Sequence, residues 1–126
     1  MTDTPTGELT LRTLAMPRDV NTNGDIFGGW VLSQMDMAAG IVAAARAQGR
    51  VATVAIDAMQ FIRPVKVGDV LCIYVQIVRV GRTSMGLQIE AWVLRNRQDQ
   101  REKVTEGLFT FVAIDEAGKP RVLPAV

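Results

Sequence analysis

The sequence of 126 residues contains no histidine and a single cysteine, Cys72. Without histidine, one chain cannot build a Ser-His-Asp or Cys-His catalytic site or a histidine metal centre. One cysteine can form neither an internal disulfide nor a closed zinc site, so we expect a reducing compartment and a buried thiol at Cys72. Any chemistry must therefore fall to carboxylates, hydroxyls, amides, Lys or Arg side chains and the backbone. We expect no metal and no separate cofactor.

Strong charge and long apolar runs are also missing. The net charge of +1 gives no reason to expect binding to nucleic acid or to a membrane surface. No apolar run reaches the ~20 residues that span a bilayer, and the start "MTDTPTGE" does not resemble a secretory signal. These features predict a soluble cytoplasmic protein. Basic residues gather locally among acidic neighbours, which indicates a solvated hairpin tip, at Arg95, Arg97, Arg101 and Lys103.

One helix and several strands are predicted along the chain. Apolar alternation over residues 9–16 indicates a first strand. Residues 28–47 are rich in Ala, Met, Leu and Gln and predict a helix, with Gly49 as its stop. Long extended runs follow at 50–62, 69–80, 83–94 and 103–115.

The order of these elements predicts the fold. Consecutive strands joined by short connections favour an antiparallel sheet, and long strands favour a twisted one. A helix that is apolar nearly all round must also be covered nearly all round. We therefore predict an α+β fold, a curved five-stranded antiparallel sheet wrapped around one long central helix. It forms a single domain over residues 8–126, after a flexible tail at 1–7.

One sheet covers only part of such a helix. A stripe of small residues on the helix is predicted to meet a second copy of the chain, to line a ligand groove, or both. Its members are Gly29, Ser33, Asp36, Gly40 and Ala43.

Asp36 interrupts the apolar helix between Met35 and Met37. Burying an unpaired carboxylate costs several kcal/mol, so Asp36 is either bonded to backbone or arginine for structure, or it is functional. The helix start favours the second alternative, because the free N–H groups at Gly28 and Gly29 and the helix dipole make an oxyanion site. Eight residues, ~12 Å along the helix axis, separate Gly28 from Asp36.

These residues suit one kind of bond best. Asn21, just upstream, is a common turn residue, but its amide can also hold a water or a carbonyl without carrying charge. Cleavage of an ester or amide usually needs an acid to protonate a poor leaving group, whereas a thiol, with a pKa near ~8.5, leaves as the thiolate. A carboxylate with an oxyanion hole therefore points to a thioester substrate.

Four segments resemble the hotdog-fold acyl-CoA thioesterases of the YciA type, and more loosely the repeats of the cytosolic acyl-CoA thioester hydrolases. They are "MPRDVNTNGDIFGGWVLSQMD" (16–36), "FIRPVKVGDVL" (61–71), "VGRTS" (80–84) and "VTEGLFTFVAID" (104–115). The resemblance implies the hotdog fold and hydrolysis of acyl-CoA to a free acid and coenzyme A, which is part of the substrate. It also implies a homo-oligomer, in which dimers assemble into a hexamer as a trimer of dimers.

The resemblance also implies roles for individual residues. Asp36 matches the catalytic aspartate, which acts as a general base for water or as a direct nucleophile. Asn21 matches an asparagine that works with the aspartate of another subunit, and Gly28 and Gly29 match the helix-start amides. Thr53 lies near the site.

A second group is implied to bind the substrate. Phe27 stands where the YciA-type pattern also has phenylalanine. The "GRTS" segment matches a contact region for coenzyme A, in which an arginine can pair with phosphate and two hydroxyls can donate hydrogen bonds, although a plain hairpin turn fits it equally well. Its residues are Arg82, Thr83 and Ser84, and other basic candidates for the nucleotide are Arg50, Arg63 and Arg79.

Two alternative functions remain at this point. A non-catalytic acyl-CoA binding or sensing module would share the fold but would not need Asp36 and the glycine pair. A hydratase or dehydratase acting on acyl thioesters would generally pair a carboxylate with a histidine, which this chain lacks.

Overall fold

The computed structural model describes residues 4–95 and 101–125. One helix, α1, is followed by four of the five strands, in the predicted order. The elements are β1 (Glu8–Leu14), the short 3₁₀ helix η1 (Pro17–Asp19), α1 (Gly28–Ala47), β2 (Val51–Phe61), β3 (Val70–Val80), β4 (Ser84–Leu94) and β5 (Arg101–Ala113).

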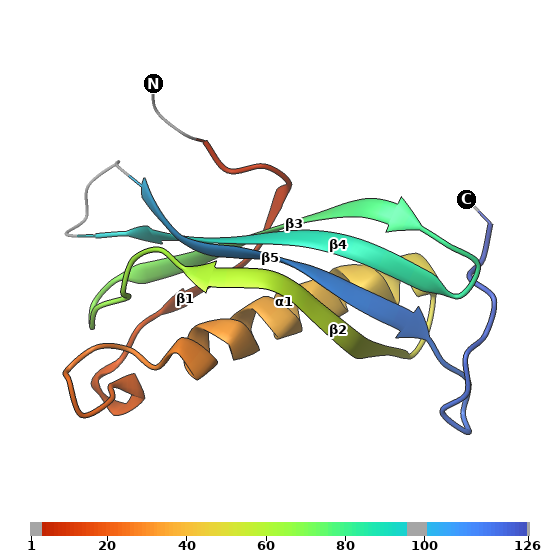
Figure 1. Ribbon diagram of the computed structural model, residues 1–126, viewed down its shortest axis with the longest axis horizontal. Coiled ribbons are helices and arrows are strands. Elements are labelled where there is room, and N and C mark those ends of the chain that lie inside the picture. Colours follow the sequence, from red (N-terminus) through yellow and green to blue (C-terminus); the bar gives the residue numbers. More distant parts are fainter. Residues whose placement is uncertain (1–3, 96–100, 126) are drawn as a thin grey trace.

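The five strands form one antiparallel sheet in the order β1-β3-β4-β5-β2. The sheet curves around α1, which lies along a single face (Figure 1). After α1 the chain crosses to the far side, so β2 pairs with β5 and forms an edge of the sheet. The predicted architecture, a curved sheet wrapped around one central helix, is confirmed.

The helix spans the predicted residues but ends differently from the prediction. Its last turn is closed by Gln48, which adopts the left-handed conformation with φ of 53° and donates its N–H to the final turn. Gly49, the predicted stop, is the next residue and donates its N–H to the Ala44 carbonyl at 3.2 Å, so the helix ends beside it, but the left-handed residue is Gln48. A Cβ at Gly49 would lie 2.7 Å from Nη2 of Arg121, the end of a flexible side chain.

The core lies between α1 and the concave face of the sheet. Alternate residues of β4 belong to the same core cluster as the buried face of the helix, namely Met85, Leu87, Ile89, Ala91 and Val93. On α1, buried positions recur every three or four residues, at Val31, Met35, Ala38, Ala39, Ala43 and Ala47. Ala43 therefore belongs to the buried row that faces the sheet, and its assignment to the stripe of small residues predicted to meet a second copy or a ligand is wrong.

The opposite face of α1 is uncovered in the single chain. Met37 is 50% exposed and Ile41 is 58% exposed. On β2, which is the nearest strand edge, Val54 is also exposed. As predicted, one sheet covers only part of the helix. Among the described residues, α1 is not apolar enough over its length to cross a membrane.

The first residues of the chain are anchored where they are described. The predicted flexible tail covered residues 1–7, of which 1–3 lie outside the described residues. Thr6 donates both its N–H and its hydroxyl to the buried carboxylate of Glu90 on β4. Gly7, with φ of 91°, packs so tightly that a Cβ would lie 2.7 Å from the Val75 carbonyl oxygen. Thr6 and Gly7, both within the predicted tail, therefore lie against the sheet.

Candidate active site

Asp36 projects from the less covered side of α1. It was predicted to be buried, but it is only half-buried, because in the single chain nothing packs against this face of the helix. The Thr53 hydroxyl on β2 donates to Oδ1 of Asp36 at 2.6 Å. No arginine in the described part of the chain bonds to Asp36, so its second oxygen stays open. The predicted proximity of Thr53 to Asp36 is therefore found, and its contact is with the carboxylate itself.

Asn21 lies in the turn between η1 and α1, and its amide orientation is fixed by its neighbours. Oδ1 accepts the backbone N–H groups of Asn23 at 2.8 Å and Asp25 at 3.1 Å. A flipped amide would place its NH₂ group against two donors, so the amide oxygen must face the turn. Asn21 is thus a turn residue, and the turn leaves its Nδ2 as an outward donor.

The helix start provides unpaired donors. Phe27 precedes the helix, and its carbonyl accepts the N–H groups of Trp30 and Val31. Within residues 4–95 and 101–125, the N–H groups of Gly28 and Gly29 have no acceptor. A Cβ on Gly29 would meet nothing within 4 Å, which leaves its backbone open to approach, as predicted.

Gly28 has a different reason to be glycine. A Cβ at Gly28 would lie 3.3 Å from the ring of Phe61, at the end of β2. The Phe61 ring therefore occupies the side of the helix start that a side chain would need. Phe27 is 50% exposed beside this start.

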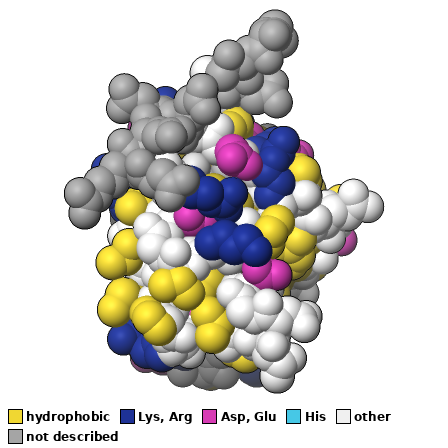
Figure 2. All heavy atoms as spheres, turned by 90° about the vertical axis from the view of Figure 1, so that its left-hand side faces the viewer, with side chains coloured by type: hydrophobic (Ala, Val, Ile, Leu, Met, Phe, Trp, Pro, Cys, Tyr) yellow, Lys and Arg dark blue, Asp and Glu magenta, His cyan; other side chains and the backbone are white. Residues whose placement is uncertain are grey.

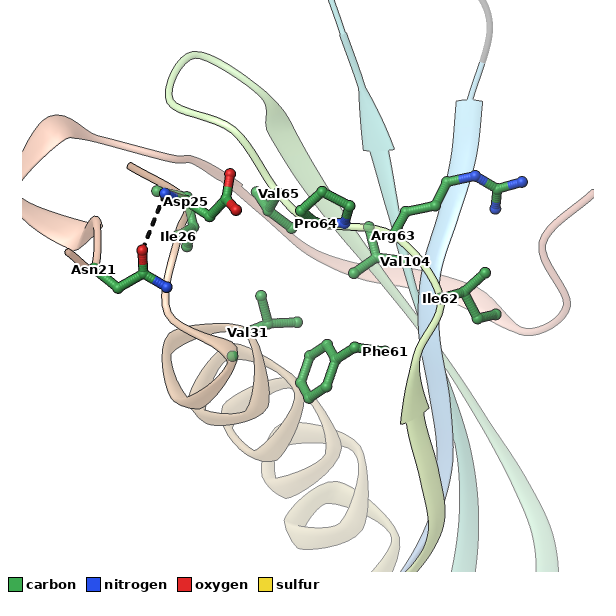
Figure 3. Close-up of a pocket in the computed structure, with 11 residues that line it drawn as sticks. Asn21, Asp25, Ile26, Val31, Phe61, Ile62, Arg63, Pro64, Val65 and Val104 are labelled. Carbon is green, nitrogen blue, oxygen red and sulfur yellow. Dashed lines mark hydrogen bonds between the residues drawn. The ribbon is translucent and has the colours of Figure 1, made fainter. Parts of the chain in front are cut away.

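A pocket of about 270 Å³ opens between the helix start and the β2–β3 loop (Figure 3). Asn21 and Gly28 lie on its wall, and Phe61 and Val31 face one another across it. Most of the remaining lining is apolar, with Arg63 extending away from Asn21. Asp36 is not part of the lining. One chain therefore places Asn21 and Asp36 in different surroundings.

The "GRTS" segment is a hairpin turn between β3 and β4, at the other end of α1 from the pocket (Figure 1). The Arg82 and Thr83 carbonyls accept N–H groups from Leu123 and Ala113. Ser84 Oγ accepts from Arg79 at 3.3 Å, and the Arg82 side chain is exposed. The segment is thus a structural turn with an exposed cation, and the single chain does not bring it to Asp36 or Asn21.

The other basic candidates are spread over the fold. Arg50 bonds to the carbonyls of Asp115 and Glu116. Arg63 bonds to the Lys103 carbonyl and pairs with Glu102 at 3.3 Å. In the described part of the chain, no three His, Cys, Asp or Glu residues are grouped so that they could hold a metal ion.

Comparison with known proteins decides the family, because residues 23–99 match the thioesterase superfamily. The chain belongs to that superfamily. This thioesterase is 55% identical to the acyl-CoA thioester hydrolase YciA of Salmonella typhimurium, over 98% of this chain and 96% of that protein. The resemblance to YciA-type thioesterases is confirmed.

Solved structures confirm the hotdog fold of this thioesterase. The hexameric thioesterase y2039 from Yersinia pestis matches it with a TM-score of 0.92 and 54% identity, over 98% of this chain and 100% of that one. HI0827, a hexameric broad specificity acyl-coenzyme A thioesterase, matches with a TM-score of 0.92 and 49% identity, over 99% of this chain and 89% of that one.

Some residues around the site were not predicted. The segment "FIRPVKVGDVL" contributed to the resemblance, but no role was inferred for Phe61 or Asp69 in it. Arg95 was assigned to a solvated tip, whereas it bonds to Asp69, which is 2% exposed. Arg97, from the same predicted tip, lies outside the described residues. The turn-forming residues at 67–69 were the signal in the sequence that could have pointed to Asp69, because they mark the loop between β2 and β3.

Proposed function

We propose that this protein is an acyl-CoA thioesterase that hydrolyses acyl-CoA to a free carboxylic acid and coenzyme A. One observation carries the proposal: Thr53 holds one oxygen of Asp36 and leaves the other open, on the same helix whose first N–H groups are unpaired. The close relationship to YciA supports the substrate class.

The chemistry follows from these groups. As a general base, Asp36 takes a proton from water while the water oxygen attacks the thioester carbonyl carbon. The carbonyl oxygen becomes an oxyanion, and the N–H groups of Gly28 and Gly29 stabilise it. The tetrahedral intermediate then collapses, the C–S bond breaks, and the thiolate of coenzyme A leaves. Alternatively, an Asp36 oxygen attacks the carbonyl carbon itself, the C–S bond breaks and the thiolate of coenzyme A leaves. Water then hydrolyses the resulting anhydride, which releases the carboxylic acid and restores the Asp36 carboxylate.

Asn21 contributes a donor and not a base. Its oxygen is saturated by two backbone N–H groups, so only Nδ2 can reach a ligand. Nδ2–H suits a carbonyl oxygen or the oxygen of the attacking water. Thr53 acts through Asp36, by orienting its carboxylate, and is a positioning residue.

The acyl chain would lie in the apolar part of the pocket beside Asn21, against Phe61 and Val31. Because Asp36 does not line this pocket, we propose that Asn21 works with Asp36 of a second subunit. The uncovered face of α1 and the exposed edge strand β2 provide the surface for that subunit. The hexameric state of two relatives supports a trimer of dimers.

The coenzyme A part of the substrate would reach the "GRTS" turn of another subunit, since that turn lies at the far end of α1 in its own chain. Arg82 is exposed there and can pair with phosphate. The reaction needs no metal in this scheme, because carboxylate and backbone groups supply every step. We further propose a cytoplasmic location, supported by the relationship to YciA.

A thiol-release assay with a panel of acyl-CoA substrates tests this function. We expect release of coenzyme A that a chelator does not suppress. Binding of acyl-CoA without release would identify a binding module instead. Addition of water to an enoyl-CoA, followed by its absorbance, would identify a hydratase.

A further inference from the structure

An ion pair between buried Asp69 and partly exposed Arg95 holds the loop that follows β2. Asp69 accepts Nε of Arg95 at 3.0 Å on Oδ1 and Nη2 at 2.8 Å on Oδ2, a two-pronged contact. Oδ2 of Asp69 also accepts the Lys66 N–H at 2.8 Å. The hydrogen bond with Asp69, together with the charges of Asp69 and Glu102, raises the pKa of Arg95 above its ordinary value despite partial desolvation. Arg95 therefore stays charged throughout the working pH range.

Arg95 holds this loop at both ends. Nη2 donates to the Pro64 carbonyl at 3.1 Å as well as to Asp69. Pro64 and the next residue, Val65, both line the pocket. Figure 2 looks onto this end of the molecule, where basic and acidic side chains lie close together beside hydrophobic ones.

The same loop is bonded to the turn that carries Asn21. The Val65 carbonyl accepts the Ile26 N–H at 3.0 Å, and the Lys66 ammonium pairs with Asp25. Asp25 in turn donates its N–H to Oδ1 of Asn21, and its carbonyl accepts the Asn21 N–H at 2.6 Å. A short series of hydrogen bonds therefore runs from Arg95 through the loop to the Asn21 amide. Figure 3 shows its last bond, from the Asp25 N–H to the Asn21 amide oxygen.

The energetics suggest a role beyond stability. An ion pair with one buried partner contributes little net stability, because desolvation of the buried carboxylate offsets much of the attraction between the charges, yet a two-pronged contact has a strict geometry. We propose that Arg95 and Asp69 are positioning residues for the reaction, and that they set the place of the Asn21 donor through the β2–β3 loop. This inference rests on the proposed function. The Arg95–Asp69 pair would thus affect the rate of hydrolysis without contacting the substrate.

Arg95→Lys tests the proposal, because lysine keeps the charge but cannot bond to both Asp69 oxygens and the Pro64 carbonyl. We expect kcat for acyl-CoA hydrolysis to fall about tenfold, with KM within about twofold of wild type. We also expect the effect to vanish in an Asn21→Ala background, since the pair acts through Asn21. A double-mutant cycle measures this coupling.

Arg101→Lys is the matched control. Arg101 lies opposite Leu94 in the sheet, next to Arg95, but donates to the Tyr74 hydroxyl at 3.0 Å, away from the loop. We expect its kcat and KM to equal those of wild type. If Arg95→Lys does not fold, as judged by circular dichroism, Lys66→Met cuts the exposed link to Asp25 and enters the same cycle.

The outcomes separate the two proposals. If the wild-type protein releases no coenzyme A from any acyl-CoA, the proposed function fails. If the wild type is active and Arg95→Lys keeps its kcat, the positioning role is overturned. A loss that multiplies with the loss caused by Asn21→Ala also overturns it, because that result indicates a general structural effect.

Discussion

The Thr53 hydroxyl on the edge strand β2 donates to Oδ1 of Asp36 on α1, 2.6 Å away. The bond joins residues of two elements that only the turn after the helix connects, and it fixes the plane of the carboxylate. Among the described residues, the second oxygen of Asp36 has no hydrogen-bond partner. The position of the proposed base therefore depends on a neighbour that does no chemistry.

Thr53→Val removes this donor and keeps the side-chain shape. We expect kcat to fall about tenfold, equivalent to about 1.4 kcal/mol, because the carboxylate loses its fixed orientation. KM should change little. Steady-state thiol release measures both, and Thr10→Val, which removes a hydroxyl bonded only to the Glu8 carbonyl on β1, is the matched control. Wild-type kcat in Thr53→Val would disprove the orienting role.

Asn21→Asp distinguishes the structural role of the Asn21 side chain in the turn from its proposed role as a hydrogen-bond donor in catalysis. The new carboxylate still accepts the N–H groups of Asn23 and Asp25, so the turn should fold, but the Nδ2 donor is lost. We expect kcat to fall about a hundredfold or more, the usual cost of losing one oxyanion donor. Asn23→Asp, an exposed change in the same turn, should keep wild-type rates. Equal losses in the two variants would assign the effect to charge alone.

Much of the fold was predictable because its signals are local. Composition placed α1 at the correct residues, and the long extended runs after it gave four strands in the correct order. Only the left-handed residue at the end of α1 was placed wrongly, because Gln48 adopts a conformation that usually favours glycine.

The site was predictable only in part, because it depends on contacts between distant residues. Asp36 stands out as a charge in an apolar helix, whereas Asn21 in a turn does not differ from any other turn asparagine. Arg95 lies 26 residues from Asp69 in sequence, and nothing local distinguishes it from a solvated cation. Arg95 and Asp69 are brought together only by the pairing of β3 with β4, in which Val70 lies opposite Leu94.

Mixed oligomers test whether Asn21 and Asp36 come from different subunits. We expect Asn21→Ala and Asp36→Ala each to lose most of the activity on their own, with Asn21→Ala keeping a low but measurable rate. Co-expressed subunits that pair at random should regain activity, with about a quarter of the sites carrying both native residues. Thiol release from the purified mixture measures the recovery. A mixture as inactive as its parents would place both residues in one subunit's site.

Phe61 is predicted to limit the length of the acyl chain, because its ring closes the pocket at the helix start. Phe61→Ala should raise kcat/KM for long acyl-CoA substrates relative to short ones by about tenfold. Competition between two chain lengths gives the ratio directly. Val67→Ala, in the same loop but outside the pocket lining, should keep the wild-type ratio. An unchanged ratio in Phe61→Ala would place the acyl chain elsewhere.

The most direct test of the catalytic role of Asp36 is to compare the rate of coenzyme A release by Asp36→Asn with that of wild type, on the same acyl-CoA. Asparagine preserves the size of the side chain and can still accept the Thr53 hydroxyl, but it can neither take a proton from water nor attack the carbonyl. We predict a loss of at least about a thousandfold in kcat with the fold and the oligomer intact. Release at a rate near that of wild type would contradict the account.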